Sequence, residues 1–369
     1  EGELTGAEFS HESWKALLSD YPNLSGFETG LVVSTDFPDE LKKHSLPEEV
    51  EIEGVVKLDG AEEIGLDNIG ADQLEIDQRP LLKARVYLQG GDLVEVGLDS
   101  VEWAAPYINE NAVGGRPKSV IDVLEVGHVV RFRRTKNGLL RLSQVPEVQG
   151  AIVAMDPTDG GISAMVGGFD FSLSNFNRTT QSKRQPGSSF KPFVYSAALE
   201  QGYTTSTELL NQPLIVVIDD TTNWDPQNHD ASTGLLTTLR EGLRNSLNLI
   251  SVRVVQELVS PKEISNNAID FGISTYIRPV DAIALGVSEV YPLEITMAYA
   301  TISNNGIYSK PMAITRIEDR HGRILKEYLP ESREVQDEAT IFILRDMMKS
   351  VVDGGTGSAL RWKYKFYAP

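Results

Sequence analysis

The sequence of 369 residues contains no cysteine and only five histidines. The absence of cysteine excludes disulfide bonds, thiolate nucleophiles and cysteine metal sites. Such a protein tolerates an oxidising compartment, because it has no thiol to protect. The histidines are scattered without the close pairing of metal ligands, so we expect neither a metal nor another cofactor.

Basic residues are also scarce, and long apolar runs are missing. The chain has 34 Lys and Arg against 53 Asp and Glu, a net charge of -19. This charge argues against nucleic acid or an anionic membrane surface as a partner, because both attract basic patches. The sequence contains no apolar run near the about 18 residues of a spanning helix, and it carries no signal peptide. We therefore expect any membrane anchor to lie outside this sequence.

The length is sufficient for two globular units, and 41% of the residues are hydrophobic. Residues 1–29 are polar with one short helical pattern, so we interpret them as a linker segment. Over residues 30–148, short runs bounded by turn residues predict a small β-barrel. Its predicted strands are 30–34, 50–56, 82–88 and 93–96, and its predicted hairpin turns are 90–92 and 136–138.

Residues 149–369 form the second expected unit. Two strand-like runs at 151–157 and 161–168 flank a tight turn and predict a hairpin of a second sheet. Apolar residues three and four apart then predict a series of helices. These are 192–201, 235–243, 250–258, 292–304 and 338–352. A sheet followed by many helices is an α+β arrangement.

The sequence contains one Ser-x-x-Lys motif, Ser188 to Lys191. At the start of a helix, residues three apart share a face, so the Lys191 amine could take the proton of the Ser188 hydroxyl. The positive end of the helix dipole favours a neutral Lys191, and the first-turn N–H groups could stabilise an oxyanion. Gly187 permits close approach of a substrate, and Pro192 suits a first helical turn. Alternatively, Ser188 only caps the helix and Lys191 is a solvated surface charge.

Ser246-Leu247-Asn248 lies between two predicted helices, where a hydroxyl and an amide can project into a cleft. The same Ser-x-Asn pattern occurs at 265–267 and 303–305, which we interpret as helix caps or turns. Position distinguishes Ser246, because it follows Trp224-Asp225-Pro226-Gln227-Asn228 and precedes the helix predicted at 250–258.

Further motifs occur in a characteristic order. They are Asp156-Pro157, Gly167-Gly168-Phe169-Asp170, Phe176-Asn177-Arg178, Arg184-Gln185-Pro186-Gly187-Ser188, Ala284-Leu285-Gly286, Ser288-Glu289-Val290, Pro292-Leu293-Glu294 and Gly354-Gly355-Thr356-Gly357. Together with Ser246-x-Asn248 they resemble the transpeptidase domain of class A penicillin-binding proteins. Upstream, Val101-Glu102-Trp103-Ala104 and Asp122-Val123-Leu124-x-x-Gly127 resemble the OB-like domain of the 1A type of Gram-negative bacteria.

The resemblance implies a fold, an activity and a location. The fold is a serine transpeptidase/β-lactamase-like α+β domain at 149–369, preceded by an OB-like β-barrel domain at 30–148. The activity is peptidoglycan D,D-transpeptidation, with stem peptides ending in D-Ala-D-Ala as substrate and β-lactams as covalent inhibitors. In the family a glycosyltransferase domain accompanies these domains, and the location is the periplasmic face of the bacterial inner membrane.

The same resemblance implies residue roles. Ser188 would be the nucleophile and Lys191 its base. Ser246 would relay the proton to the leaving amine, and Asn248 would bind Lys191 and the substrate. Substrate-binding positions would be Gly187, Ser189, Trp224 and Asn228.

One family motif is missing and leaves other functions open. No Lys-Thr-Gly occurs, although the family has it on the strand lining the cleft. We expect it shortly after residue 369, in which case the transpeptidase domain is incomplete at its C-terminus and impaired. An alternative is a non-catalytic docking fragment that binds an outer-membrane lipoprotein activator through residues 30–148. A β-lactam hydrolase is less favoured, because the sequence is long and lacks a clear Glu-x-x-x-Asn loop.

Overall fold

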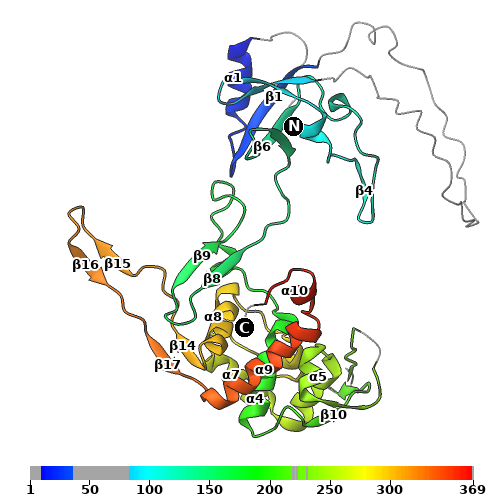
Figure 1. The fold of residues 1–369 in the computed structure, drawn as a ribbon, viewed down its shortest axis with the longest axis vertical. Helices are drawn as coiled ribbons and strands as arrows, with labels where there is room; N and C mark the ends of the chain where they lie inside the picture. Colours follow the sequence, from blue (N-terminus) through cyan, green and yellow to red (C-terminus); the bar gives the residue numbers. More distant parts are fainter. Residues whose placement is uncertain (1–9, 36–82, 218–220, 222, 230–231, 368–369) are drawn as a thin grey trace, which may run out of the picture. The chain divides into compact units, whose positions relative to one another are not determined.

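The computed structural model describes residues 10–35, 83–217, 221, 223–229 and 232–367 (Figure 1). The protein divides into two compact units, Glu1–Glu147 and Val148–Pro369. Each unit has its own hydrophobic core, and each is described by itself.

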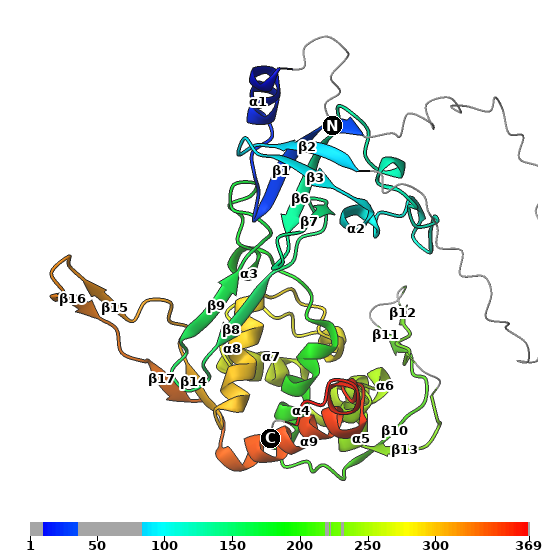
Figure 2. The ribbon, with the colours of Figure 1, turned by 45° about the horizontal axis from the view of Figure 1, so that its top comes forward.

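Unit 1 is built on a five-stranded antiparallel sheet with the order β3-β2-β1-β6-β7 (Figure 2). Apolar residues of its strands form one core with those of the short helical segments between β3 and β6. The strands are β1 (Phe27–Thr35), β2 (Ala84–Leu88), β3 (Leu93–Val96), β6 (Val129–Arg134) and β7 (Leu140–Ser143). The smaller elements are α2 (Leu98–Val101), β4 (Tyr107–Asn109), β5 (Ala112–Val113) and a 3-10 turn, Val120–Asp122.

The structure has more strands in unit 1 than the sequence analysis predicts. The strands predicted at 30–34, 82–88 and 93–96 correspond to β1, β2 and β3. The turn predicted at 136–138 joins β6 to β7. The sequence analysis predicts neither of these two strands. The strand predicted at 50–56 lies outside the described residues.

The helix α1 (His11–Ser19) lies in the segment interpreted as a linker. In the structure, this helix packs on the sheet of unit 1: Leu18 is buried in a cluster with Leu31 of β1 and Tyr87 of β2. The strand β1 also begins at Phe27, within that segment. The description of 10–29 as a linker is therefore wrong, because the apolar side of α1 is buried against β1 and β2.

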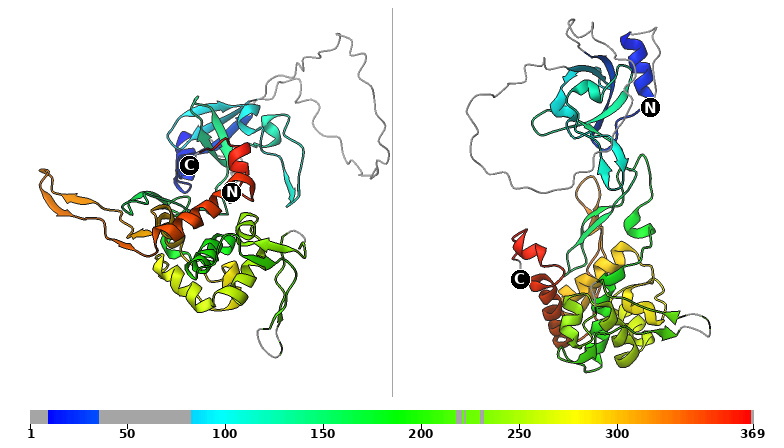
Figure 3. Two further views of the ribbon diagram at one scale, coloured as in Figure 1. Left: turned by 60° about the horizontal axis from the view of Figure 1, so that its bottom comes forward. Right: turned by 90° about the vertical axis from the view of Figure 1, so that its right-hand side faces the viewer.

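Unit 2 is mainly helical, with α4 (Lys191–Glu200) at its centre. Nine of the ten residues of α4 are buried, so this helix is enclosed on all sides. The remaining helices of unit 2 pack on α4 or on one another (Figure 3). They are α3 (Arg178–Gln181), α5 (Leu239–Arg244), α6 (Asn248–Arg253), α7 (Pro261–Asp270), α8 (Pro292–Ser303), α9 (Glu338–Gly354) and α10 (Ala359–Trp362).

The strands of unit 2 form antiparallel pairs. The pair predicted at 151–157 and 161–168 is present as β8 (Ile152–Met155) and β9 (Ile162–Val166), and β8 packs on α8. The other pairs are β10 (Glu208–Leu210) with β13 (Leu236–Thr238), β11 (Val216–Val217) with β12 (Asn223–Trp224), β14 (Ile307–Ser309) with β17 (Ser332–Glu334), and β15 (Arg316–Glu318) with β16 (Ile324–Glu327). In Figure 1, β15 and β16 extend away from the helices of the unit.

Two helical predictions need correction. Residues 236–238 of the helix predicted at 235–243 are the strand β13, because Leu236 to Thr238 pair with β10, and the helix begins only at Leu239. The helix predicted at 250–258 begins earlier, at Asn248, and ends in a π-helical turn, Val254–Leu258. The remaining predicted helices match α4, α8 and α9 within a few residues.

Candidate active site

The Ser188 motif lies where the chain enters the central helix. Residues Gly187–Phe190 form a 3-10 turn that continues into α4. Ser188 is exposed at this turn, whereas Lys191 is only 1% exposed. Pro192 occupies the first turn of α4, as predicted. The interpretation of Lys191 as a solvated surface charge is therefore wrong.

The Lys191 amine is held by three oxygen atoms. Its Nζ donates to the Ser246 carbonyl oxygen at 2.7 Å, to Ser246 Oγ at 3.1 Å and to Asn248 Oδ1 at 2.8 Å. The structure thus brings together three of the four residues that the resemblance assigns to catalysis. Within the described residues, no hydrogen bond joins Ser188 Oγ to Lys191 Nζ, so the predicted contact of these two groups is not formed in this state.

The electrostatics of Lys191 follow from its burial. No carboxylate of the described residues lies within ion-pair distance of its amine, and its three acceptors are uncharged. Burial in this neutral surrounding lowers the pKa of Lys191 to about 8. The lowered pKa increases the neutral fraction of the amine near physiological pH, and a neutral amine can accept a proton.

Ser246 has an unusual backbone conformation. It follows α5 with φ of 52°, in the left-handed region that non-glycine residues seldom adopt. The Ser246 amide donates to Leu243 O at 3.0 Å and the Leu247 amide donates to Gly242 O at 2.8 Å. These two bonds make a Schellman motif, in which Ser246 takes the position usually occupied by glycine. The turn reverses the chain so that both oxygens of Ser246 reach Lys191.

Asn248 and Asn228 belong to one hydrogen-bonded network. Asn248 donates through Nδ2 to Gln227 O at 2.7 Å while its Oδ1 accepts from Lys191. Asn228 accepts from the Leu249 amide at 3.0 Å and donates to Asn211 Oδ1 at 2.9 Å. Both polar groups of Asn228 thus bond to the protein itself, and the residue orders the start of α6.

The other predicted binding positions differ in what they contact. Gly187 has φ of 57° and donates its amide to Gly286 O at 3.3 Å. Ser189 is exposed, and its hydroxyl donates to Pro186 O at 2.7 Å. Trp224 is half-buried and packs on the core of unit 2. Of the four predicted binding positions, Gly187 and Ser189 adjoin Ser188, and Asn228 lies beside Asn248.

Tyr299 of α8 contacts the nucleophile turn and was not predicted. Its hydroxyl donates to the Ser189 carbonyl oxygen at 2.8 Å. Burial raises the pKa of Tyr299 to about 12, so the phenol stays protonated and remains a donor. The contact joins residues 110 positions apart, and no local motif marks it.

The Ser-x-Asn patterns at 265–267 and 303–305 lie within α7 and at the end of α8, respectively. Residues 265–267 lie inside α7, where Ser265 Oγ donates to Ile277 O at 3.0 Å. Their interpretation as a cap or turn is therefore wrong, because this hydroxyl bonds across to a neighbouring segment. Residues 303–305 end α8 in a turn, as predicted, with Asn305 at φ of 54°.

Comparison with known families assigns both units. A model of the penicillin-binding protein transpeptidase domain matches residues 150–368. A model of the penicillin-binding protein OB-like domain matches residues 75–148. The first match covers more than half of the sequence, so the chain belongs to the penicillin-binding protein transpeptidase family. The resemblance drawn from the motifs and the α+β fold class are confirmed.

Individual relatives carry the same description. The sequence is 40% identical over 257 residues to penicillin-binding protein 1A of Pseudomonas aeruginosa, covering 69% of this chain and 31% of the relative. It is 33% identical over 319 residues to penicillin-binding protein 1A of Vibrio cholerae, covering 78% of this chain and 38% of the relative. The sequence thus spans about a third of the length of the curated relatives it matches.

A solved structure supports the fold of the protein. The crystal structure of penicillin-binding protein 1A from Haemophilus influenzae matches with a TM-score of 0.73 at 24% identity. The match covers 96% of this chain and 50% of that chain. Among the described residues of this protein, none of the helices combines the length and the apolar character needed to cross a membrane.

Proposed function

We propose that this protein is a peptidoglycan D,D-transpeptidase that uses Ser188 as its nucleophile. Ser188 Oγ attacks the carbonyl carbon of the penultimate D-Ala of a stem peptide, and the peptide C–N bond breaks. The terminal D-Ala leaves, and an ester to Ser188 remains. The amine of a second stem peptide then attacks this ester, which forms the cross-link and regenerates the hydroxyl.

In this proposal, the proton moves through the residues around Lys191. Neutral Lys191 takes the proton from Ser188 Oγ, and Ser246 passes it to the departing amine. Asn248 orients the lysine and the substrate peptide. First-turn N–H groups at Ser188 stabilise the oxyanion, and Gly187, Ser189 and Trp224 line the substrate path. The chemistry requires neither a metal nor a cofactor.

The observation that carries the proposal is a buried lysine with neutral partners near an exposed serine. A buried amine without a carboxylate partner is unfavourable for stability, so such a group points to a catalytic role. The missing Ser188–Lys191 bond does not oppose the role, since catalytic hydrogen bonds often form only with substrate bound. β-Lactams would trap Ser188, because their strained amide resembles D-Ala-D-Ala.

Labelling with penicillin tests the proposal. In the full-length protein, we expect mass spectrometry to place one covalent penicillin adduct on Ser188 and Ser188→Ala to abolish it. Ser189→Ala is the matched control, because Ser188 should still be labelled when this neighbouring exposed serine is replaced. An adduct on Ser246 would contradict the assignment, and sustained turnover of penicillin would favour a β-lactam hydrolase instead.

A docking role of unit 1 is the second candidate function. The hairpin of β4 and β5 exposes three apolar side chains: Tyr107 at 75%, Ile108 at 61% and Val113 at 68%. We propose that an outer-membrane lipoprotein activator binds unit 1 there, with the enzyme at the periplasmic face of the bacterial inner membrane. Tyr107→Ser should weaken activator binding without changing penicillin labelling of Ser188, and unchanged binding would exclude this hairpin.

A further inference from the structure

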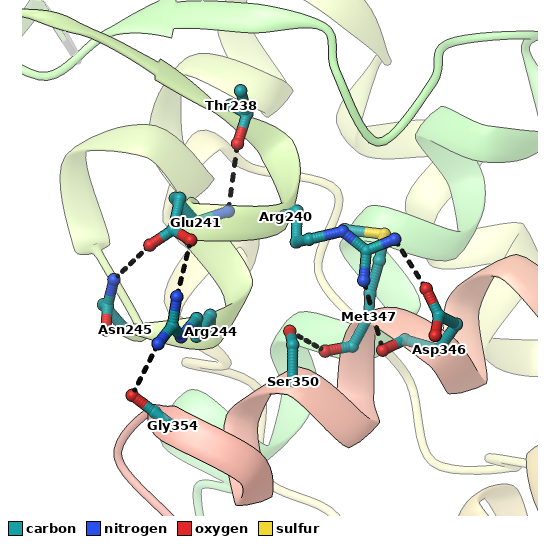
Figure 4. Close-up of polar contacts among 9 residues, drawn as sticks. All are labelled: Thr238, Arg240, Glu241, Arg244, Asn245, Asp346, Met347, Ser350 and Gly354. Carbon is teal, nitrogen blue, oxygen red and sulfur yellow. Dashed lines mark hydrogen bonds and ion pairs between the residues drawn. The ribbon is translucent and has the colours of Figure 1, made fainter.

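Two arginines of the short helix α5 connect it to α9 (Figure 4). Arg240 donates to Asp346 Oδ2 at 2.6 Å. Arg244, one turn later, donates through Nη2 to the carbonyl oxygen of Gly354 at 3.1 Å, at the C-terminal end of α9. The two side chains are similarly exposed, at 33% and 37%. They differ in their distance along the sequence from Ser246.

Arg244 bonds to both the end of α9 and the end of α5. Its Nη1 donates to Glu241 Oε1 at 2.9 Å, and Asn245 Nδ2 donates to the other oxygen of this carboxylate at 2.9 Å. The planar guanidinium reaches Glu241 through Nη1 and Gly354 through Nη2, whereas a lysine has a single nitrogen at the end of its side chain. A cation at the C-terminus of α9 also interacts favourably with the helix dipole.

The backbone of Arg244 is held as closely as its side chain. The Thr356 amide donates to the Arg244 carbonyl oxygen at 3.2 Å. A Cβ at position 355 would overlap this same carbonyl group, which explains why glycine stands there. The Gly354-Gly355-Thr356 segment therefore packs directly on the last turn of α5.

The turn that follows Arg244 forms part of the candidate active site. Ser246 is two residues further along and has the unfavourable φ of 52°. A residue in this conformation persists only where its surroundings hold it, since the conformation itself costs of order 1–3 kcal/mol. Lys191 bonds to Ser246 from one side, and Arg244 connects the residues just before the turn to the end of α9 through its side chain and its carbonyl group.

We propose that Arg244 is a positioning residue, which holds the Ser246 turn so that its two oxygens face the Lys191 amine. The inference rests on the proposed function, in which Lys191 is the base for Ser188. Arg244 touches neither Ser188 nor Lys191, so its effect passes through the backbone of residues 244–246.

The test compares Arg244→Ala with Arg240→Ala in the full-length protein. Both substitutions remove an arginine that joins α5 to α9, so loss of stability alone should affect both. We expect Arg244→Ala to slow acylation of Ser188 by labelled penicillin by about tenfold to a hundredfold. The midpoint of the pH dependence of acylation should also move upward in Arg244→Ala. A loosened turn admits water to Lys191, which raises the pKa of its amine toward the ordinary value. Arg240→Ala should keep the wild-type midpoint.

A second measurement does not depend on acylation. Hydrogen–deuterium exchange should speed up at the amides of Ser246 and Leu247 in Arg244→Ala and stay unchanged in Arg240→Ala. If exchange there is the same in both variants, Arg244 does not hold the turn and the inference fails. If the wild type itself is not labelled at Ser188, the proposed function fails, while exchange still decides the role of Arg244.

Arg244→Lys covers the case in which the alanine variant does not fold. Lysine keeps the positive charge, but its single nitrogen does not reproduce the two separate donors that arginine directs to Gly354 and Glu241. We expect an acylation rate between those of Arg244→Ala and the wild type. A wild-type rate and pH midpoint in Arg244→Lys would overturn the proposal.

Discussion

Gly286 packs against Gly187, directly behind the turn that carries Ser188. The Gly187 amide donates to the Gly286 carbonyl oxygen at 3.3 Å, and Gly286 has φ of 64°. A Cβ at position 286 would overlap the Gly187 carbonyl oxygen and lie 2.8 Å from the Phe190 Cβ. The Ala284-Leu285-Gly286 motif therefore supports the nucleophile turn, although it lies about a hundred residues away in sequence.

From this contact we predict that Gly286→Ala lowers the unfolding free energy by more than the strain of its positive φ alone would. Strain at positive φ costs about 1 kcal/mol of unfolding free energy, and the overlap with Gly187 adds to it. Gly322→Ala is the control, because Gly322 has φ of 80° with open space around it. Chemical denaturation should show a larger loss for Gly286→Ala, together with slower acylation of Ser188. Equal losses in the two variants would mean that the turn adapts to the methyl group.

The lowered pKa of Lys191 predicts the pH dependence of acylation and of stability. Acylation by penicillin should rise with pH through about 8, where the amine becomes neutral. In the unfolded chain, the amine has its ordinary, higher pKa and binds more protons, so the unfolding free energy should also rise above pH 8. Lys191→Met should remove both dependences. A wild-type rate that is flat between pH 6 and 9 would exclude Lys191 as the titrating base.

The charge of Lys191 can be separated from its basicity by Lys191→Arg. The guanidinium remains protonated at all accessible pH values, so it cannot accept the proton of Ser188. We expect the Arg variant to lose acylation even where circular dichroism shows that it is folded. Near wild-type acylation of Lys191→Arg would reduce the residue to an electrostatic or structural role.

The left-handed conformation of Ser246 predicts that stability and activity respond differently to substitution. Ser246→Gly should be more stable than Ser246→Ala by about 1 kcal/mol, because glycine adopts positive φ without strain. Both variants lack the hydroxyl, so both should acylate slowly. Denaturation and penicillin labelling of the two proteins check this prediction, and a more stable alanine variant would contradict the Schellman geometry.

The buried carboxylate of Glu294 predicts a purely structural effect. It accepts from the amides and hydroxyls of Ser274 and Thr275 and from the Tyr291 amide. Glu294→Gln replaces an acceptor by a donor among these donors and should lower the unfolding free energy by about 1–3 kcal/mol. The exposed neighbour Glu289→Gln should change stability little. A loss of acylation in folded Glu294→Gln would instead assign this carboxylate to the site.

Local signals in the sequence determined the class of this protein and the start of its central helix. The Ser188 motif, Pro192 and the ordered motifs are readable because each reflects a constraint within a few residues. Helical periodicity likewise predicted α8 and α9, since each of these helices buries one side of itself, and short runs bounded by turn residues predicted β1 and β2. Where the pattern was short, as at 236–238, pairing with a distant strand decided the structure.

Tertiary structure alone decided what surrounds the Lys191 amine and which residues hold that surrounding in place. Burial of Lys191 results from the packing of α4 among helices distant in sequence, and the lowered pKa follows from this burial. The role of Gly286 behind Gly187, the Tyr299 bond to Ser189 and the Arg244 bond to Gly354 each join segments about a hundred residues apart. No local pattern encodes such contacts, because they depend on how whole helices pack.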